Sequence, residues 1–196
     1  MPIYSRLYSK SQRRAQPSPS LIKPYLRQLA GSGSTLDGVV VERIIDAPLL
    51  GIESAPPASP QHLLILPLEH SATLTWRMDG RWKQTTLSNG ASILNPAGFF
   101  TRPRWHTPTE RLMVAIAPIV ADKISETLGL NGTVNLEPRY PFRDELLNQL
   151  ARSLLTEFEQ DTPPDVLYAE SLANMLVVHL IKTYSASHLR PHTIPR

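Results

Sequence analysis

The hydrophobic period of the sequence changes once, close to Pro118. On the N-terminal side of Pro118, apolar and polar residues alternate in short runs separated by turn residues, which is typical of strands. On its C-terminal side, apolar residues recur every three or four positions, which is typical of amphipathic helices. Strands followed by helices indicate an α+β fold. We therefore expect a β-domain over residues 37–117 and a helical region over residues 118–185.

The clearest local signal is a hairpin over residues 72–87. Asp79-Gly80 lies between two alternating runs, and this dipeptide supports the positive φ angles that a tight hairpin turn needs. Further turn signals recur between residues 38 and 117, and the chain holds 19 prolines against nine glycines. Many short strands with frequent turns predict an antiparallel barrel or sandwich.

Two strong helices are predicted after the β-domain, over residues 142–160 and 165–184. Both carry a wide apolar stripe at helical spacing. Such stripes usually pack within one chain, but a β-domain of this size leaves part of them uncovered, so we expect a homodimer. The candidate interface residues are Leu172, Met175, Leu176 and His179.

The charges are distributed unevenly along the chain. All 17 acidic residues lie between residues 37 and 185, whereas residues 1–36 carry six Lys or Arg and no acid. The sequence isoelectric point near 9.3 therefore comes from the termini. Because phosphate binding needs clustered cations, a DNA-binding surface in the folded body is disfavoured. We expect residues 1–36 to form a basic flexible arm and residues 186–196 a disordered tail.

Several classes of protein are excluded or disfavoured by what the sequence lacks. The chain contains no cysteine, which excludes a disulfide scaffold, an iron–sulfur site and a thiol nucleophile. No apolar run is long enough to span a bilayer, and the basic N-terminus lacks the apolar segment of a secretory signal. We expect a cytoplasmic protein without membrane contact. Nucleotide-binding, serine-hydrolase and zinc-protease motifs are missing, so we expect neither enzymatic activity nor catalytic residues.

Three groups of segments carry a family resemblance. They are Pro-Gln-His-Leu-Leu-Ile at 60–65; Asp-Gly-Arg-Trp at 79–82 with Gly90, Leu-Asn-Pro-Ala-Gly at 94–98 and Arg-Trp at 104–105; and Leu-Tyr-Ala-Glu-Ser-Leu-Ala-Asn at 167–174 with Val-His-Leu at 178–180 and Tyr-Ser at 184–185. Together these segments resemble the cupin-type sensor half of AraC/XylS-family transcription regulators over residues 38–185.

This resemblance implies a jelly-roll barrel that binds a small-molecule effector, a helical region that dimerises, and a DNA-binding domain with two helix-turn-helix units. Only eleven residues follow Ser185, and one helix-turn-helix module needs about three helices. We therefore expect DNA binding only through a C-terminal domain that this chain lacks. The chain is then either a piece of a longer regulator or a natural truncated regulator that forms inactive heterodimers.

Four residues are candidates for lining an effector cavity: His62, Trp76, Arg104 and Trp105. An aromatic ring beside an arginine can stack on a sugar or an aromatic ligand while the guanidinium pairs with an anion. Aromatic residues also fill the interior of small barrels, so packing explains the two tryptophans equally well. The resemblance fixes none of these residues.

A small metal-dependent cupin enzyme is the alternative function. A metal ion would have to gather His62, His70 and His106 from separate strands, without the dense ligand spacing of most catalytic metal sites. We therefore expect no metal site and no cofactor. On an apolar helical face, His179 is a core or interface residue.

Overall fold

The computed structural model describes residues 27–28, 38–46, 59–78, 80–99, 104–107, 109–160, 162–186 and 190–191. The helices are α1 (Pro118–Thr127), α2 (Glu145–Glu159) and α3 (Val166–Tyr184). The strands are β1 (Arg27–Gln28), β2 (Val39–Asp46), β3 (His62–Pro67), β4 (Ala72–Met78), β5 (Arg81–Leu87), β6 (Ala91–Asn95), β7 (Arg104–Trp105), β8 (Thr109–Ile116), β9 (Leu130–Asn131), β10 (Arg139–Arg143) and β11 (Arg190–Pro191).

The strands form antiparallel sheets, as the sequence pattern predicts. A six-stranded sheet has the order β1-β2-β8-β3-β6-β10, and a three-stranded sheet has the order β5-β4-β7. The predicted hairpin is β4 and β5, which pair from Ala72 with Leu87 to Met78 with Arg81. In its turn, Gly80 has a φ of 74°. The fold is therefore an assembly of antiparallel sheets with three helices; among the described strands the two larger sheets stay separate, and a closed barrel is not shown.

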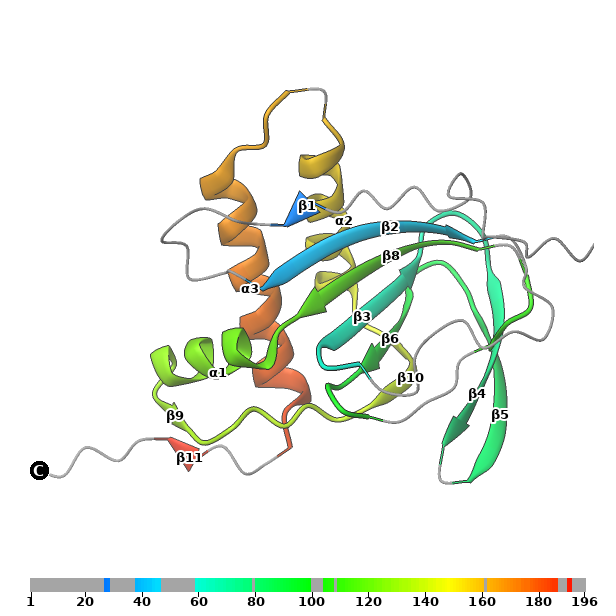
Figure 1. Ribbon diagram of the computed structural model, residues 1–196, viewed down its shortest axis with the longest axis horizontal. Coiled ribbons are helices and arrows are strands. Elements are labelled where there is room, and N and C mark those ends of the chain that lie inside the picture. The colour runs from blue at the N-terminus through cyan, green and yellow to red at the C-terminus, as the bar shows by residue number, and fades with distance from the viewer. Residues whose placement is uncertain are drawn as a thin grey trace, which may run out of the picture.

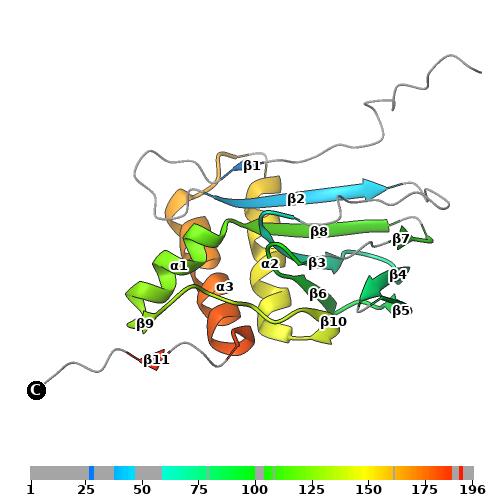
Figure 2. The same ribbon diagram turned by 60° about the horizontal axis from the view of Figure 1, so that its bottom comes forward.

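The molecule has three layers, with the six-stranded sheet in the middle. Its one face packs on the helices and forms the main hydrophobic core, and its other face meets the three-stranded sheet at a second, smaller cluster. Figure 1 shows the three helices on one side and the β4–β5 hairpin on the other, and Figure 2 shows the same separation from below. Both faces of the central sheet are thus covered. Because alternate residues of a strand point to opposite faces, the position of a residue in its strand determines whether its side chain packs against the helices or against the three-stranded sheet.

The two long helices begin at aspartate caps. The side chain of Asp144 accepts a hydrogen bond from the Leu147 N–H (2.9 Å), and that of Asp165 accepts one from the Tyr168 N–H (3.1 Å). The predicted start of the first helix at residue 142 is therefore three residues early. Residues 139–143 form β10 instead, because they pair with β6 at the edge of the six-stranded sheet.

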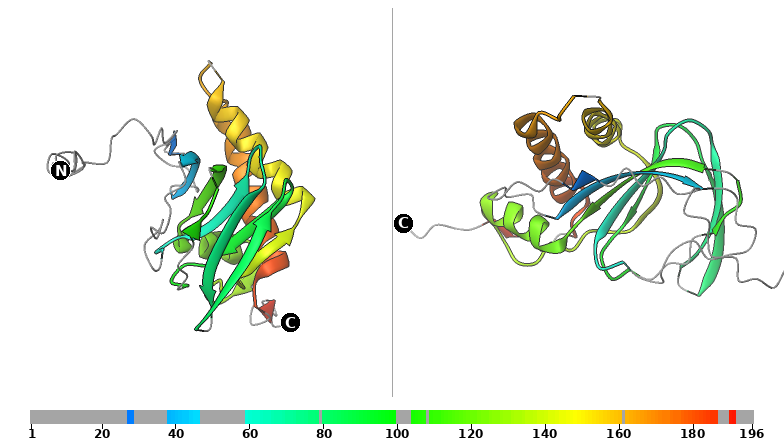
Figure 3. Two further views of the ribbon diagram at one scale, coloured as in Figure 1. Left: turned by 90° about the vertical axis from the view of Figure 1, so that its right-hand side faces the viewer. Right: turned by 45° about the horizontal axis from the view of Figure 1, so that its top comes forward.

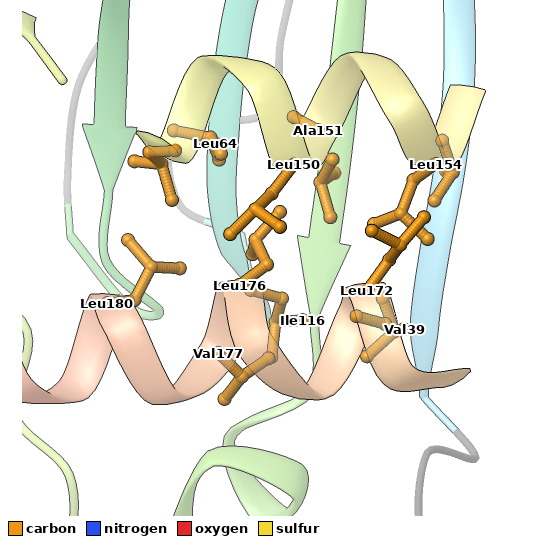
Figure 4. Packing of buried hydrophobic residues seen from close by; sticks show 14 of the residues in the cluster. Val39, Leu64, Ile116, Leu150, Ala151, Leu154, Leu172, Leu176, Val177 and Leu180 are labelled. Atoms are coloured by element: carbon orange, nitrogen blue, oxygen red, sulfur yellow. The ribbon is translucent and has the colours of Figure 1, made fainter. Parts of the chain in front are cut away.

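The helical core uses two of the four residues that we expected at a dimer interface. Leu172 and Leu176 on α3 are buried within the chain, where they face the leucines of α2 and the strands behind them (Figure 4). His179 is half-buried and hydrogen-bonded within the chain. Met175 is the exposed member of the four, with 57% of its surface accessible. The stripe on α3 is apolar, as the sequence predicts, but its residues Leu172 and Leu176 pack within the chain.

Two short pairings lie inside the segments that we expected to be an arm and a tail. Arg27–Gln28 pairs with β2, and Arg190–Pro191 pairs with β9. The backbone just after α3 also follows the chain between α1 and β10, since the Ala186 N–H donates to the Asn135 carbonyl (2.8 Å). The rest of residues 1–36 and of the terminal segment lies outside the described residues. No helix among the described residues is long and apolar enough to cross a membrane.

Candidate functional site

Strand β8 presents chemically different side chains to its two covers. Leu112, Val114 and Ile116 point to the helices and are fully buried in the main core. The residues of opposite parity include Thr109 and Arg111, which are only 5% and 7% exposed. Burying a guanidinium is costly unless its surroundings provide compensation. The face of the six-stranded sheet that packs against the three-stranded sheet is therefore the candidate functional site.

Two of the predicted cavity residues, Trp76 and Trp105, meet on this face. Both are buried, at 3% and 7% exposure, within the second cluster. The Trp76 indole N–H is also buried, and in the part of the chain that the structure describes it has no hydrogen-bond acceptor. A buried donor without a partner destabilises the fold by about 1–3 kcal/mol. An acceptor atom of a bound molecule would satisfy this donor.

Arg111 lies against one of these indoles. Its guanidinium carbon is 4.4 Å from the centroid of the Trp105 ring, which is a cation–π contact. Arg111 also donates to the Thr109 hydroxyl (3.3 Å) from the same strand. The guanidinium is thus held in a fixed orientation inside the protein.

A tyrosine from the sheet edge completes the arrangement. The Tyr140 ring of β10 stacks on Trp76, with centroids 5.3 Å apart and planes inclined by 26°. Its hydroxyl donates to the amide oxygen of Asn95 (2.9 Å), which ends β6 and is buried. We call this group the inter-sheet site. Its members come from five different strands: Trp76, Asn95, Trp105, Arg111 and Tyr140.

The other two predicted cavity residues lie elsewhere. His62 shares the helix-facing side of β3 with Leu64 and Leu66, because alternate residues of a strand point the same way. Arg104 lies over the ring of Trp82, 4.5 Å from its centroid, on the side of the three-stranded sheet that faces away from the site. Of the four candidates, the structure therefore brings together Trp76 and Trp105.

His62 is a buried histidine whose surroundings disfavour its charged form. Burial lowers its pKa below the ordinary value, and the negative charge of Asp122 opposes this effect only in part. Its Nδ1 accepts a hydrogen bond from the Ala97 N–H (3.0 Å), which requires the neutral ring with its proton on Nε2. That Nε2 is buried, and among the described residues it has no acceptor. The contacts of His62 are those of a structural residue.

The three histidines of the alternative function do not form a metal site. His70 is exposed beside Glu69, and His106 is exposed with its Nε2 3.0 Å from the Thr75 hydroxyl. His62 is buried on the helix side. No group of three or more His, Asp or Glu side chains in the described ranges is arranged to hold a metal ion. Within the described residues, His62, His70 and His106 therefore do not come together as the ligand set that the alternative function would need.

Strand β10 connects the inter-sheet site to the end of α3. Tyr140 lies in the site, while the Phe142 ring meets the Tyr184 ring edge-on with centroids 5.0 Å apart. Directly after the strand, the Asp144 carboxylate accepts from the Tyr184 hydroxyl (2.6 Å) and lies 2.7 Å from His179 Nε2. We call Asp144, His179 and Tyr184 the α3 clasp. One strand thus contacts both the site and the last turns of α3.

The clasp shifts the pKa values of two of its members. Burial acts to raise the pKa of Asp144, but hydrogen bonds from Tyr184, the Leu147 N–H and His179 outweigh it and hold this pKa below its ordinary value. Burial raises the pKa of Tyr184, and the hydrogen bond and negative charge of Asp144 raise it further. Both shifts favour an ionised aspartate beside a neutral tyrosine.

The sequence matches no protein-family model and no curated protein. Solved structures show partial likeness. One is the AraC-like transcriptional activator CuxR, with 14% identity and a TM-score of 0.47, over 78% of this chain and 55% of that one. Another is Streptomyces albus HEPD with 2-hydroxyethylphosphonate and Fe(II) bound, with 23% identity and a TM-score of 0.37, over 53% of this chain and 23% of that one.

A third similar structure is a putative mannose-6-phosphate isomerase from Ralstonia eutropha. It shows 24% identity and a TM-score of 0.36, over 51% of this chain and 87% of that one. The present chain thus spans less than two thirds of the length of CuxR and of HEPD. The similar structures include both a regulator and enzymes, and all three TM-scores are below 0.5. Activity, ligand and partners therefore do not follow from these likenesses.

Proposed function

We propose that this chain is the ligand-sensing and dimerisation domain of an AraC-type transcriptional regulator, with a cupin-like β-domain and no enzymatic activity of its own. The observation that carries the proposal is the inter-sheet site. Five strands place two indoles, a phenol, an amide and a guanidinium between two sheets. Leucine and valine would fill that space at a lower cost of desolvation.

The chemistry of the inter-sheet site is that of binding. Indole and phenol rings stack on flat or sugar-like molecules, and the Arg111 guanidinium and Trp76 N–H donate hydrogen bonds. The single hydroxyl among the five side chains, on Tyr140, already donates to Asn95. A small molecule with a ring and at least one acceptor oxygen suits these groups. Proteins commonly bind such ligands with a mostly apolar lining and a few fixed polar groups.

Strand β10 supplies a route from the ligand to the helices. A ligand that moves the Tyr140 ring acts on the strand whose next residues hold Tyr184 and the α3 clasp. The direction in which the chain leaves α3 would then depend on the state of the site. A ligand can transmit a signal only through different affinities for two such arrangements.

The proposed dimer uses the apolar residues that the main core leaves exposed. Leu167 and Met175 on α3 are 75% and 57% exposed, and Ile119 on α1 is 58% exposed. Between these two helices lies a groove lined by Lys123, Ile124, Thr127, Leu128, Asn174 and Val178. A second copy of the chain would cover these side chains, and DNA binding would then come from a C-terminal domain of the full regulator.

A thermal-shift screen of sugars, amino acids and aromatic acids tests the sensing function. We expect at least one class of compound to raise the melting temperature of the wild-type chain, because a ligand that binds only the folded state stabilises it. The same compound should lose its effect in Trp105→Ala and keep it in His62→Gln, whose residue lies outside the site. A compound whose shift survives Trp105→Ala binds elsewhere and contradicts the assignment.

A further inference from the structure

The three-stranded sheet carries a concentration of positive charge that the chain as a whole does not show. Strands β4, β5 and β7 together contain Arg77, Arg81, Lys83 and Arg104 but no Asp or Glu. The helices differ, since α2 and α3 carry four glutamates against Arg152 and Lys182. Folding therefore separates the charges, and the hairpin lies far from the helices in the right view of Figure 3.

Three of these cations have no carboxylate partner among the described residues. Arg77, Arg81 and Lys83 are exposed, and within the described residues none of them lies within ion-pair distance of an acid. By contrast, Arg43 pairs with both Glu110 and Glu159 at 3.2 and 3.1 Å. The turn between the two strands contains one acid, Asp79, so residues 72–87 hold three cations and one acid and carry a net charge of +2.

An exposed tryptophan lies beside these charges. Trp82 is 47% exposed, whereas the other two tryptophans are buried. It pairs in register with Arg77 and carries the Arg104 guanidinium over its ring, 4.5 Å from the centroid. Cations on β5 could serve only to protect a sheet edge from pairing with other chains. Protection of the edge gives no reason for a half-exposed indole at the same place.

The outer face of the three-stranded sheet is polar apart from this ring. By strand parity it presents Thr73, Thr75, Arg77, Trp82, Gln84, Thr86 and Arg104. It offers no aliphatic side chain, whereas a protein–protein interface needs a desolvated apolar centre. A nucleic acid strand needs cations for its phosphates and an aromatic ring for its bases. The chemistry of this face matches the nucleic acid better than an acidic protein.

We propose that the outer face and tip of the β4–β5 hairpin bind a nucleic acid strand without sequence preference. Arg77, in register with Trp82, and Arg81, next to the turn, contact phosphates, and an unpaired base stacks on the exposed part of Trp82. This site is separate from the inter-sheet site and from any helix-turn-helix domain. The outcome of its test is therefore independent of the proposed sensing function. It departs from the expectation, drawn from the sequence, that a DNA-binding surface in the folded body is disfavoured.

The test measures binding of labelled DNA to the full chain by fluorescence anisotropy at about 50 mM and about 200 mM salt. One probe is a single-stranded 20-mer, and the other is the same sequence as a duplex. Arg77→Glu/Arg81→Glu should weaken binding of both probes by more than tenfold. The matched control is Arg139→Glu/Lys182→Glu, which makes the same charge change at exposed positions of β10 and α3 and should change affinity less than threefold.

Substitution of Trp82 is expected to change the affinity for the two probes differently. Trp82→Ala should weaken binding of the single strand by about tenfold and leave duplex binding unchanged, because paired bases cannot stack on a protein ring. Quenching of tryptophan emission by the single strand should likewise disappear in Trp82→Phe, since the other two indoles are buried. Trp82 is exposed, so circular dichroism should show both variants folded.

Three results would overturn the proposal. The first is an equal loss of affinity in the two charge-reversal variants, which would assign binding to net charge or to the basic N-terminal segment. The second is single-strand binding that Trp82→Ala leaves intact. The third is poly-glutamate binding as tightly as the oligonucleotide, which would assign the surface to an acidic protein partner.

Discussion

The two faces of the six-stranded sheet are packed by different kinds of side chain. Toward the helices, strands and helices contribute mostly aliphatic side chains to one continuous core. Toward the three-stranded sheet, the buried cluster has seven members, two of them tryptophans, with Tyr140 and Arg111 packed on their rings. The first face gains stability from area removed from water. The second packs a buried guanidinium on one indole and buries the N–H of the other without an acceptor among the described residues, which is why we assign it the ligand.

The largest effect is expected where the helix-facing core is deepest. Leu176→Ala should lower the free energy of unfolding by about 2–5 kcal/mol, because Leu176 is fully buried between α2, α3 and the sheet. Denaturant unfolding followed by circular dichroism measures this change. The control is the adjacent residue, since Met175→Ala on the exposed side of α3 should cost less than about 0.5 kcal/mol. Equal losses in the two variants would show that the face assignment of α3 is wrong.

The next effect concerns β10, which contacts both regions. Asp144→Asn keeps a cap for the Leu147 N–H but removes the charge that Tyr184 and His179 contact, so it should cost about 1 kcal/mol near neutral pH. The folded-state pKa of Asp144 lies below its ordinary value of 3.8. The stabilisation is therefore present above pH 3.8 and is lost as the pH falls through the lower folded pKa.

Unfolding free energies of wild type and Asp144→Asn between pH 2 and pH 7 test this sign. The difference between the two proteins should be largest at the upper end of the range and shrink toward its acid end. Other carboxylates affect both proteins equally and cancel in the difference. A gap that stays constant with pH would mean that the Asp144 charge contributes nothing to the clasp.

A smaller effect on stability, but a clear one on binding, is expected inside the inter-sheet site. Arg111→Lys keeps the positive charge and loses the planar group that lies over Trp105. We expect a loss of unfolding free energy below about 1 kcal/mol and about a tenfold weaker affinity for the compound found by the thermal-shift screen. Calorimetric titration measures the affinity. Unchanged affinity would remove Arg111 from the site and reduce this face to ordinary packing.

The sequence predicts the parts of this comparison that depend on local periodicity. Alternation along residues 111–117 separates Arg111 from Leu112 and Val114, and Asp79-Gly80 predicts the hairpin. Parity says which residues share a face, but it does not say which layer covers that face. Parity therefore does not reveal that Arg111 is buried, or that His62 faces the helices and not the three-stranded sheet.

The missed site residues depend on contacts between distant segments. Tyr140 lies in a five-residue stretch with a proline, whose strand conformation comes from pairing with β6 across a register irregularity. Such pairing leaves no periodic signal in the sequence. The same holds for Leu172 and Leu176, because an apolar stripe does not reveal whether its partner belongs to the same chain. Predicting these contacts requires the order of the strands for Tyr140 and the packing of the helices for Leu172 and Leu176.

The smallest effect on folding, and a decisive one for assembly, is expected at Met175. With 57% of its surface exposed, Met175→Glu should change the unfolding free energy by less than about 0.5 kcal/mol. If a second copy covers this side of α3, the same charge should be driven into an apolar interface and reduce the mass measured by light scattering from dimer to monomer. Gln149→Glu, which adds the same charge at an exposed polar position of α2, separates a local interface from a general effect of added charge. A wild-type chain that stays monomeric at high concentration would contradict the dimer, and the exposed apolar residues of α1 and α3 would then have to contact a different partner. The contrast between the two sheet faces does not depend on this result.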